Sequence, residues 1–204
     1  MKNSKKFSVV LASFLLIFTT SCIETVVVGS VVGGAVVVRE KSFNDTRKDI
    51  VISTKLGSIF IANGLKNPGN SIDTTVNEGR VLLTGIVRDA NKAKLAQELA
   101  WKVAGVKEVI DETQIREDGS FKAKDISIAA KDYAITTEIE SKLLFGRNIS
   151  SINYQITTVA GTVYFLGVAE NDGELRRVLS IASKVRGVER VVNYVIVKND
   201  SRRS

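Results

Sequence analysis

Side chains that could carry out chemistry are few in this chain of 204 residues. It has one cysteine, Cys22, and no histidine, so a thiol or hydroxyl nucleophile would have no imidazole base beside it. The neighbouring acids Asp111 and Glu112, and the pair Glu138 and Glu140, are interpreted as solvated charges rather than as a general acid and base. No calcium-loop or phosphate-loop motif occurs in the sequence. We therefore predict that the chain is not an enzyme and needs no cofactor or metal.

The segment before Cys22 has the layout of a secretory signal peptide. Its first six residues include Lys2, Lys5 and Lys6, an apolar run follows over residues 7–18, and small residues end it. The run is shorter than the ~20 residues that a spanning helix needs. Cleavage after residue 21 would leave Cys22 first in the mature chain, an arrangement that resembles a bacterial lipoprotein box. The resemblance implies a diacylglycerol on the thiol and an acyl chain such as palmitate on the new amino terminus. Because Ile23 rather than Asp follows, it also implies sorting to the outer membrane.

Residues 23–38 are strongly apolar, with three glycines among the valines. We interpret this segment as a tether that stays near the bilayer surface. The alternative, a second membrane span, is disfavoured by the short length and by Glu24. The formal net charge is +7, and removing the three signal lysines leaves about +4. A net positive charge this small does not indicate a nucleic-acid-binding surface.

Two tandem copies of one small unit form the rest of the chain. Three glycines of the first copy recur 82 residues later: Gly79, Gly85 and Gly105 return as Gly161, Gly167 and Gly187. Asp49 returns as Asp132, at an offset of 83. The predicted parts are a signal peptide (1–21), a lipidated tether and linker (22–48), a first unit (49–115), a linker (116–126), a second unit (127–198) and a basic tail (199–204).

Each unit is predicted to run helix, strand, strand, helix, strand. Apolar residues at helical spacing predict the first helices, with Ile52, Leu56 and Phe60 in one copy and Ile135, Ile139 and Leu143 in the other. Asp49 and Asp132 are expected to be first-turn acids or helix caps. Strands are expected at 72–76 and 81–87, and again at 154–159 and 163–168, each pair around a glycine turn. A helix over 90–103, capped by Gly105, and a strand over 106–115 complete the first unit.

This order, with Gly-Val-x-x-Val after the second helix and x-Gly-x-Val-x-Leu/Phe-x-Gly in the hairpin, resembles the BON domain. Together with the signal peptide, Cys22 and the tether, it is similar to the dual-BON outer-membrane lipoproteins of the DolP (YraP) type. The resemblance implies an α+β fold of two αββαβ domains, each with a three-stranded mixed sheet packed against two helices. It also implies a non-enzymatic protein in the inner leaflet of the outer membrane, facing the periplasm, that supports envelope integrity and, in some bacteria, cell division.

In that family the first helix of the second unit binds anionic phospholipid. At 100° per residue, Ile135, Ile139 and Leu143 share one face here, while Tyr133 and Leu144 fall near the opposite side. Outward apolar residues with basic neighbours suit shallow insertion beneath phosphate headgroups. The expected phospholipid-binding residues are Tyr133, Ala134, Lys142, Leu144, Phe145 and Arg147. The alternative is that these residues contact the first unit or are merely scattered exposed apolar residues.

The repeated glycines are interpreted as structural. Gly85 and Gly167 fall inside strands, which suggests a close backbone approach by the packed helix, a bulge or a strand end. Gly79 and Gly161 are expected in turns, and Gly105 and Gly187 at helix caps. Trp101, which has Ser183 as its counterpart, is expected either to fill a contact between the units or to anchor a partner.

Two function classes follow. The favoured one is an anchored envelope module that binds an anionic phospholipid membrane. The alternative is a protein-binding adaptor for outer-membrane assembly or cell-division components, with the second-unit helix and Trp101 as its docking surface.

Overall fold

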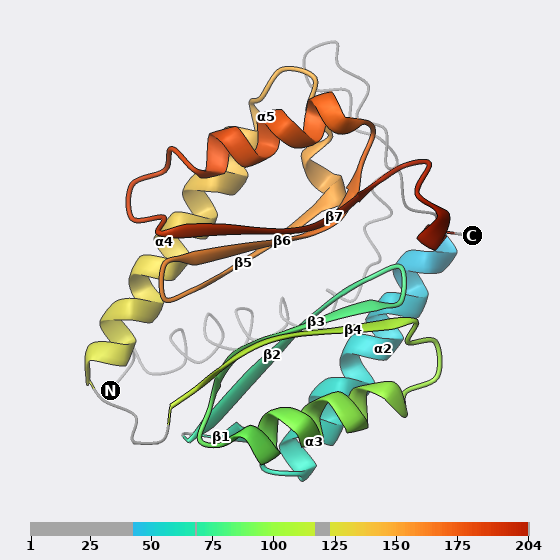
Figure 1. The fold of residues 1–204 in the computed structure, drawn as a ribbon, viewed down its shortest axis with the longest axis vertical. Helices are drawn as coiled ribbons and strands as arrows, with labels where there is room; N and C mark the ends of the chain where they lie inside the picture. Colours follow the sequence, from blue (N-terminus) through green and yellow to red (C-terminus); the bar gives the residue numbers. More distant parts are fainter. Residues whose placement is uncertain (1–42, 68, 117–122, 204) are drawn as a thin grey trace, which may run out of the picture. The chain divides into compact units, whose positions relative to one another are not determined.

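The computed structural model describes residues 43–67, 69–116 and 123–203. Both repeats belong to one compact unit within Val38–Ser204, whose helices and strands are shown in Figure 1. The expected signal peptide, Cys22 and the apolar segment 23–38 lie outside the described residues. In the described ranges, no helix combines the length and the apolarity needed to cross a bilayer.

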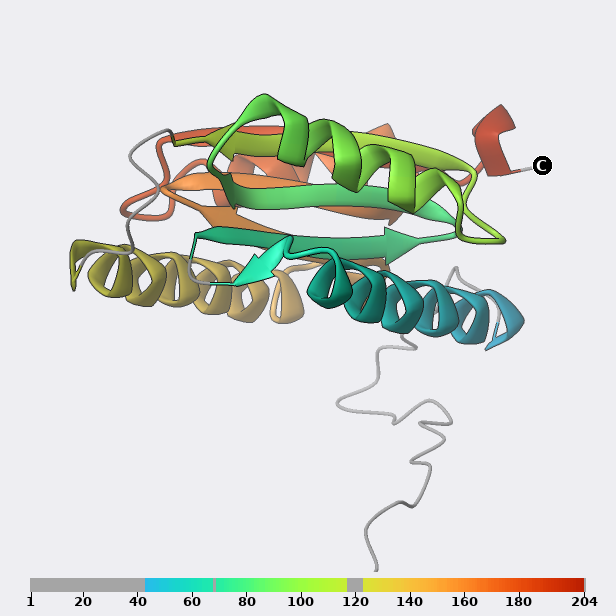
Figure 2. The same ribbon diagram turned by 90° about the horizontal axis from the view of Figure 1, so that it is seen from below.

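The first repeat is a four-stranded sheet with two helices packed on it. In chain order its elements are α2 (Phe43–Ala62), β1 (Lys66–Asn67), β2 (Asn70–Asn77), β3 (Arg80–Val87), α3 (Ala90–Trp101) and β4 (Glu108–Ile115). β1, β2 and β3 pair antiparallel, and β3 and β4 pair parallel. α2 packs along β2, and α3 packs along β3 and β4 (Figure 2). The two-residue β1 at the edge is an addition that the sequence pattern does not predict.

The second repeat has the expected three strands and two helices. Its elements are α4 (Ala123–Leu144), the 3-10 turn η1 (Ser151–Asn153), β5 (Tyr154–Val159), β6 (Thr162–Ala169), α5 (Asp172–Ala182), β7 (Arg190–Val197) and the 3-10 turn η2 (Ser201–Arg203). β5 and β6 pair antiparallel, and β6 and β7 pair parallel. The predicted α+β class and the order αββαβ in each repeat are confirmed.

The predicted apolar helix faces form the two cores. Ile52, Leu56 and Phe60 of α2 are buried in the first core, and Ile135, Ile139 and Leu143 of α4 are buried in the second. Strand residues alternate between the two faces of each sheet, as the pleat requires. Val81 and Leu83 enter the first core, whereas Leu82 between them points to the opposite face. Each sheet therefore has a helix-covered face and a second face.

Those second faces meet. Leu82 of β3 packs with Tyr164 and Leu166 of β6 in a buried cluster, and all three side chains are at most 1 % exposed. Nearby, the hydroxyls of Thr75 on β2 and Thr157 on β5 lie 3.2 Å apart and share a hydrogen bond. Apolar burial of this kind is the main favourable term in domain packing. The two repeats are thus joined through the faces of their sheets that the helices do not cover.

The expected role of Asp49 and Asp132 as helix caps is wrong. α2 and α4 begin well before these residues, so both acids lie inside the helices. The Asp49 carboxylate accepts hydrogen bonds from the backbone N–H groups of Glu78 and Gly79, at 2.7 and 2.9 Å. Asp132 accepts the equivalent bonds from Ala160 and Gly161, also at 2.7 and 2.9 Å. Each acid therefore fastens the first helix of its unit to the hairpin turn.

Candidate functional site

The outer surface of α4 holds most of the residues that the sequence singles out. Ile135, Ile139 and Leu143 fix the helix on its own sheet, which leaves the opposite side of the helix in solvent. Three large side chains there are mostly in solvent: the exposed fractions are 75 % for Tyr133, 64 % for Leu144 and 83 % for Phe145. Leucine and phenylalanine are among the residue types most often buried in proteins. The helix ends at Leu144: the Phe145 N–H still makes the α-helical bond to the Ser141 carbonyl, whereas the Gly146 N–H bonds the Leu143 carbonyl, three residues back, in a tighter last turn.

Tyr133 and Leu144 lie on one stripe of α4. They are eleven residues apart, which is close to three full turns and about 16 Å of helix. Between them, the Thr137 hydroxyl donates to the Tyr133 carbonyl at 2.9 Å, so this hydroxyl is bonded within the helix. The exposed Glu140, seven residues after Tyr133 and four before Leu144, also lies on this side of the helix, so apolar and acidic side chains share it. We call Tyr133, Leu144 and the adjacent Phe145 the α4 stripe.

The basic residues expected around this stripe are only partly grouped with it. Lys142 is exposed, but it follows Tyr133 by two and a half turns and thus lies on the other flank of the helix. There its Nζ lies 3.4 Å from the Glu138 carboxylate, an exposed i,i+4 pair of small energetic value. Ala134 and Arg147 are also exposed, Arg147 just beyond the end of α4. All six candidate residues are solvent-accessible, yet Lys142 and Tyr133 do not share one face.

A cavity of about 430 Å³ lies beside the first half of α4. Residues of β2, β3, α4 and β5 line it, including Ile86, Ile128, Tyr133 and Ile156. At its wall, Arg116 Nη1 lies 2.8 Å from Asp125 Oδ1, and the Asp125 side chain is largely buried. Sequence reasoning missed this cavity, because it depends on how the two repeats pack together. It places Tyr133 next to a hollow as well as on the α4 stripe.

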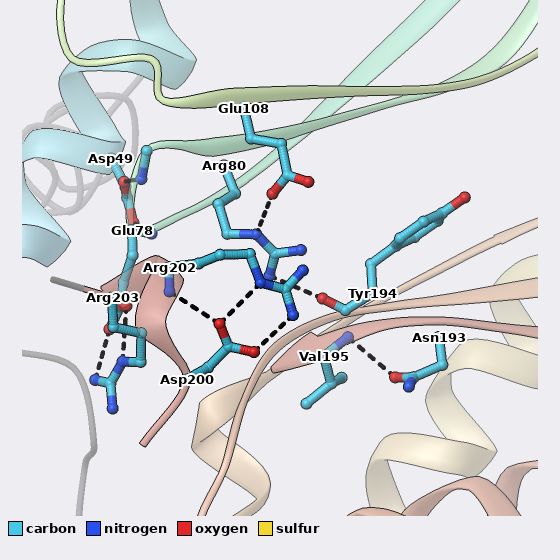
Figure 3. A network of polar contacts seen from close by, with 11 residues as sticks. Asp49, Glu78, Arg80, Glu108, Asn193, Tyr194, Val195, Asp200, Arg202 and Arg203 are labelled. Atoms are coloured by element: carbon cyan, nitrogen blue, oxygen red, sulfur yellow. Dashed lines mark hydrogen bonds and ion pairs between the residues drawn. The ribbon is translucent and has the colours of Figure 1, made fainter. Parts of the chain in front are cut away.

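Polar contacts join the first sheet to β7 of the second repeat (Figure 3). Arg80 is 3 % exposed. Its Nε donates to Glu108 Oε2 at 2.5 Å, and its Nη1 donates to the Tyr194 carbonyl oxygen at 2.8 Å. The Tyr194 hydroxyl in turn donates to the Glu112 carboxylate. A buried charge is tolerated only when it is paired and hydrogen-bonded, and the Arg80 guanidinium has both a carboxylate and a carbonyl partner.

The basic tail makes a second contact of this kind. Arg203 donates from Nε and Nη2 to the two oxygens of Glu78, at 2.9 Å each, and from Nη1 to the Lys198 carbonyl at 2.9 Å. Arg202 instead pairs with Asp200, and its hydrogen bonds hold the pKa of that carboxyl well below the usual range. The two tail arginines are therefore engaged in ion pairs within the protein.

Three tyrosines, Tyr154, Tyr164 and Tyr194, have raised pKa values, and burial is the main cause for each. Burial, reinforced by the hydrogen bond and charge of Glu112, raises the pKa of Tyr194 to about 12. Burial and the nearby Glu174 carboxylate raise the pKa of Tyr154 well above its ordinary value. All three phenols are therefore neutral at physiological pH, and Tyr194 remains a hydrogen-bond donor to the first repeat.

The strand glycines are required by the adjacent backbone and not by the packed helix. Gly85 has φ +109°, and a Cβ there would collide with the Ser71 carbonyl oxygen of β2. Gly167 has φ +151°, and a Cβ there would collide with the Asn153 carbonyl oxygen. Gly79 and Gly161 lie in the hairpin turns. Gly105 and Gly187 lie in turns after α3 and α5, a few residues beyond the helix ends, so neither is the immediate cap that was expected.

Trp101 does not fill a contact between the repeats. It ends α3, which packs on the face of the first sheet opposite to the inter-repeat cluster, and its side chain is 55 % exposed. The acid pairs also have local roles, since Asp111 accepts from Gln97 and Thr113, and Glu112 accepts from Tyr194. Among the described residues, no three His, Cys, Asp or Glu side chains are grouped to hold a metal.

The chain matches one family model twice. Residues 48–117 and 131–199 each match the BON domain, and these are the two repeats described above.

Three curated relatives are similar over most of the chain. An uncharacterized protein in the gshII 5′ region of Anaplasma centrale is 36 % identical over 155 residues, covering 76 % of this chain and 98 % of the relative. Outer membrane lipoprotein DolP of Haemophilus influenzae is 25 % identical over 188 residues, covering 92 % and 93 %. Osmotically-inducible protein Y of Escherichia coli is 30 % identical over 153 residues, covering 74 % and 73 %.

Proposed function

The chain belongs to the BON-domain family, and from this premise we propose that it is a lipid-anchored protein of the bacterial envelope whose second BON domain binds anionic phospholipid. The observation that carries the proposal is the α4 stripe. Tyr133, Leu144 and Phe145 remain in solvent on a helix whose other side is fully committed to the core. A rigid helix with an exposed apolar stripe can insert shallowly into a bilayer without unfolding.

The charges near the stripe favour an anionic membrane by a small margin. Lys131, Lys142 and Arg147 are exposed on α4 or just beyond it, against the exposed acids Glu138 and Glu140, and Lys142 pairs with Glu138. A basic residue close to an anionic surface contributes about 1 kcal/mol, and this attraction fades as salt shortens the Debye length. Apolar insertion and phosphate attraction therefore act together, but only the second depends on ionic strength.

The expected anchor places this helix where it can act. Lipid on Cys22 would hold the mature chain on the inner leaflet of the outer membrane, facing the periplasm, so α4 would meet phospholipid headgroups at high local concentration. The similarity to an outer membrane lipoprotein over 92 % of the chain supports this location. In this setting the protein would act without catalysis, as a membrane-bound module that supports envelope integrity.

Vesicle binding tests the proposal. Protein lacking residues 1–21 and carrying Cys22→Ala would be titrated with vesicles containing phosphatidylglycerol or cardiolipin, and with vesicles of phosphatidylcholine alone. We expect binding to the anionic vesicles that weakens, without vanishing, as salt is raised. Equal binding to both compositions, or none to either, would contradict the proposal.

Trp101 supports a second candidate function. An exposed tryptophan at a helix end is a common anchor in protein interfaces. The protein could therefore serve as an adaptor for outer-membrane assembly or cell-division components. Loss of partner capture in Trp101→Ala, with vesicle binding intact, would favour this function over the first.

A further inference from the structure

The exposed stripe of α4 has a counterpart on α2. At the offset of 83 that relates Asp49 to Asp132, Ile50 corresponds to Tyr133 and Ile61 corresponds to Leu144. Ile50 and Ile61 are 60 % and 64 % exposed, close to the values of their counterparts. They are also eleven residues apart, so they share one stripe along the helix.

The requirements of the fold do not explain this repetition. Ile52, Leu56 and Phe60 return as apolar residues because they fill a core. Ile50 and Ile61 contact no core, and polar residues would serve the fold equally well at such exposed positions. Other exposed positions differ between the two helices in the chemical type of their side chains. The basic Lys55, for example, corresponds to the acidic Glu138. A large apolar side chain has therefore been kept at two surface positions in both copies.

The polar groups between Ile50 and Ile61 are bonded within the helix. The Thr54 hydroxyl donates to the Ile50 carbonyl at 2.8 Å, and the Ser58 hydroxyl donates to the Thr54 carbonyl at 3.1 Å. Hydroxyls satisfied in this way can enter a headgroup region with a smaller desolvation penalty. This part of α2 is thus suited to a surface that offers few hydrogen-bond partners.

The charge on α2 indicates the sign of that surface. Arg47, Lys48 and Lys55 are exposed on the helix. Of the acids on α2, Asp45 pairs with Lys48 at 3.4 Å and Asp49 is buried against the hairpin turn. The exposed side of α2 is therefore positively charged, which complements a membrane of anionic phospholipid.

The position of α2 allows one membrane to reach both helices. α2 packs on β2 and α4 packs on β5, and these two strands meet where Thr75 and Thr157 share a hydrogen bond. Both helices therefore border the same edge of the contact between the two sheets. In Figure 2, α2 runs along the edge of its own sheet, where its outer side is not covered by α3.

We propose that α2 is a second membrane-contacting helix, with Ile50, Val51 and Ile61 entering the headgroup region of an anionic bilayer while Arg47 and Lys55 face phosphates. This inference rests on the proposed function in one respect, the identity of the ligand, because the evidence that the ligand is a bilayer comes from the α4 stripe. Two helices on one membrane would hold the protein in a fixed orientation, which a single lipid anchor on a tether does not.

Fluorescence tests the position of α2 directly. In a Trp101→Phe background, with Cys22→Ala and without residues 1–21, Ile61→Trp supplies the only tryptophan of the chain. Addition of phosphatidylglycerol vesicles should shift its emission to the blue, and Ile115→Trp, at an exposed position on β4, should show no shift. An unshifted Ile61→Trp spectrum while the vesicles are bound would overturn the proposal.

Affinity measurements separate α2 from α4. The double variant Ile50→Ser, Ile61→Ser should bind the same vesicles about tenfold more weakly, a loss of ~1.4 kcal/mol, whereas Ile115→Ser should bind as the parent does. Unchanged binding in the α2 variant with loss in an α4 variant would reject α2 as a contact and leave the proposed function standing. Unchanged binding in both variants would reject the two together. Equal melting temperatures of the variants would show that the fold is intact.

Discussion

Arg203, in the last described turn, forms a bidentate ion pair with Glu78 in the hairpin turn of the first repeat, at 2.9 Å for each hydrogen bond. The two residues are 125 positions apart, and their side chains are 18 % and 11 % exposed. Glu78 is also tied to α2, because its backbone N–H bonds Asp49. The tail that follows the second BON domain thus fastens the first domain.

Removal of this pair should destabilise the protein measurably. Arg203→Ala leaves Glu78 largely buried without its partner, and we expect a loss of about 1–3 kcal/mol, less than for a fully buried pair. Arg202→Ala is the matched control, because the Arg202 side chain is 52 % exposed and pairs with its near neighbour Asp200, so its loss should change stability less. Chemical denaturation of both variants measures the difference. Equal stabilities would show that the Glu78 pair contributes nothing.

Tyr194 should make the protein sensitive to alkaline pH. Its pKa is raised from 10.0 to about 12 in the folded state, so the neutral phenol is favoured by folding. The stabilisation is complete below pH 10 and is lost as pH rises toward 12. Melting temperatures measured from pH 8 to 11 should fall less steeply for Tyr194→Phe than for the parent. An identical slope in the two proteins would argue against a folded-state role for this phenol.

Gly167→Val should unfold the second domain rather than remove a binding contact. Its φ of +151° and the Asn153 carbonyl leave no room for a branched side chain, and overpacking alone costs ~1–3 kcal/mol. Gly57→Ala is the opposite case: it lies inside α2, and an added Cβ there meets nothing within 4 Å. That change should stabilise by ~0.5–1 kcal/mol. A Gly167→Val protein with an unchanged melting temperature would refute this assignment.

Local patterns predicted the fold well, and the contacts between the repeats poorly. Ile135, Ile139 and Leu143 could be assigned to the core because helical periodicity alone places them on one face. The role of Asp132 was predicted wrongly for two reasons. α4 begins at Ala123, before Asp132, and the hairpin turn that the Asp132 carboxylate bonds lies 28 residues further along the chain. The partners of Arg80 and Arg203 depend on how two sheets pack, which no short-range pattern encodes.

The candidate site was predictable to a similar degree. Exposure of Tyr133 and Leu144 follows from the same periodicity that buries Ile135. The grouping of Lys142 with them did not hold, because nearness in sequence is not nearness on a helix surface. The cavity beside Tyr133 could not be foreseen, as its walls come from both repeats.

Cys22→Ala should release the protein from the membrane. Cys22 lies outside the described residues, and its expected lipid rests on the signal peptide that leads to the only thiol of the chain. Without acyl chains, the remaining contacts are weak and reversible. Cell fractionation in moderate salt should move the variant into the soluble periplasmic fraction. A variant that stays firmly in the membrane fraction would contradict lipid attachment at this residue.

The most direct test is the binding of the double variant Tyr133→Ala, Leu144→Glu to phosphatidylglycerol vesicles at low and at physiological salt. The variant leaves Ile135, Ile139 and Leu143 to hold α4 on its sheet, so its melting temperature should stay close to that of the parent. We expect it to bind about tenfold more weakly than the parent at physiological salt, with most of its remaining affinity confined to low salt, where attraction to phosphates is least screened. A folded double variant that binds as tightly as the parent at every salt concentration would show that α4 is not the phospholipid site.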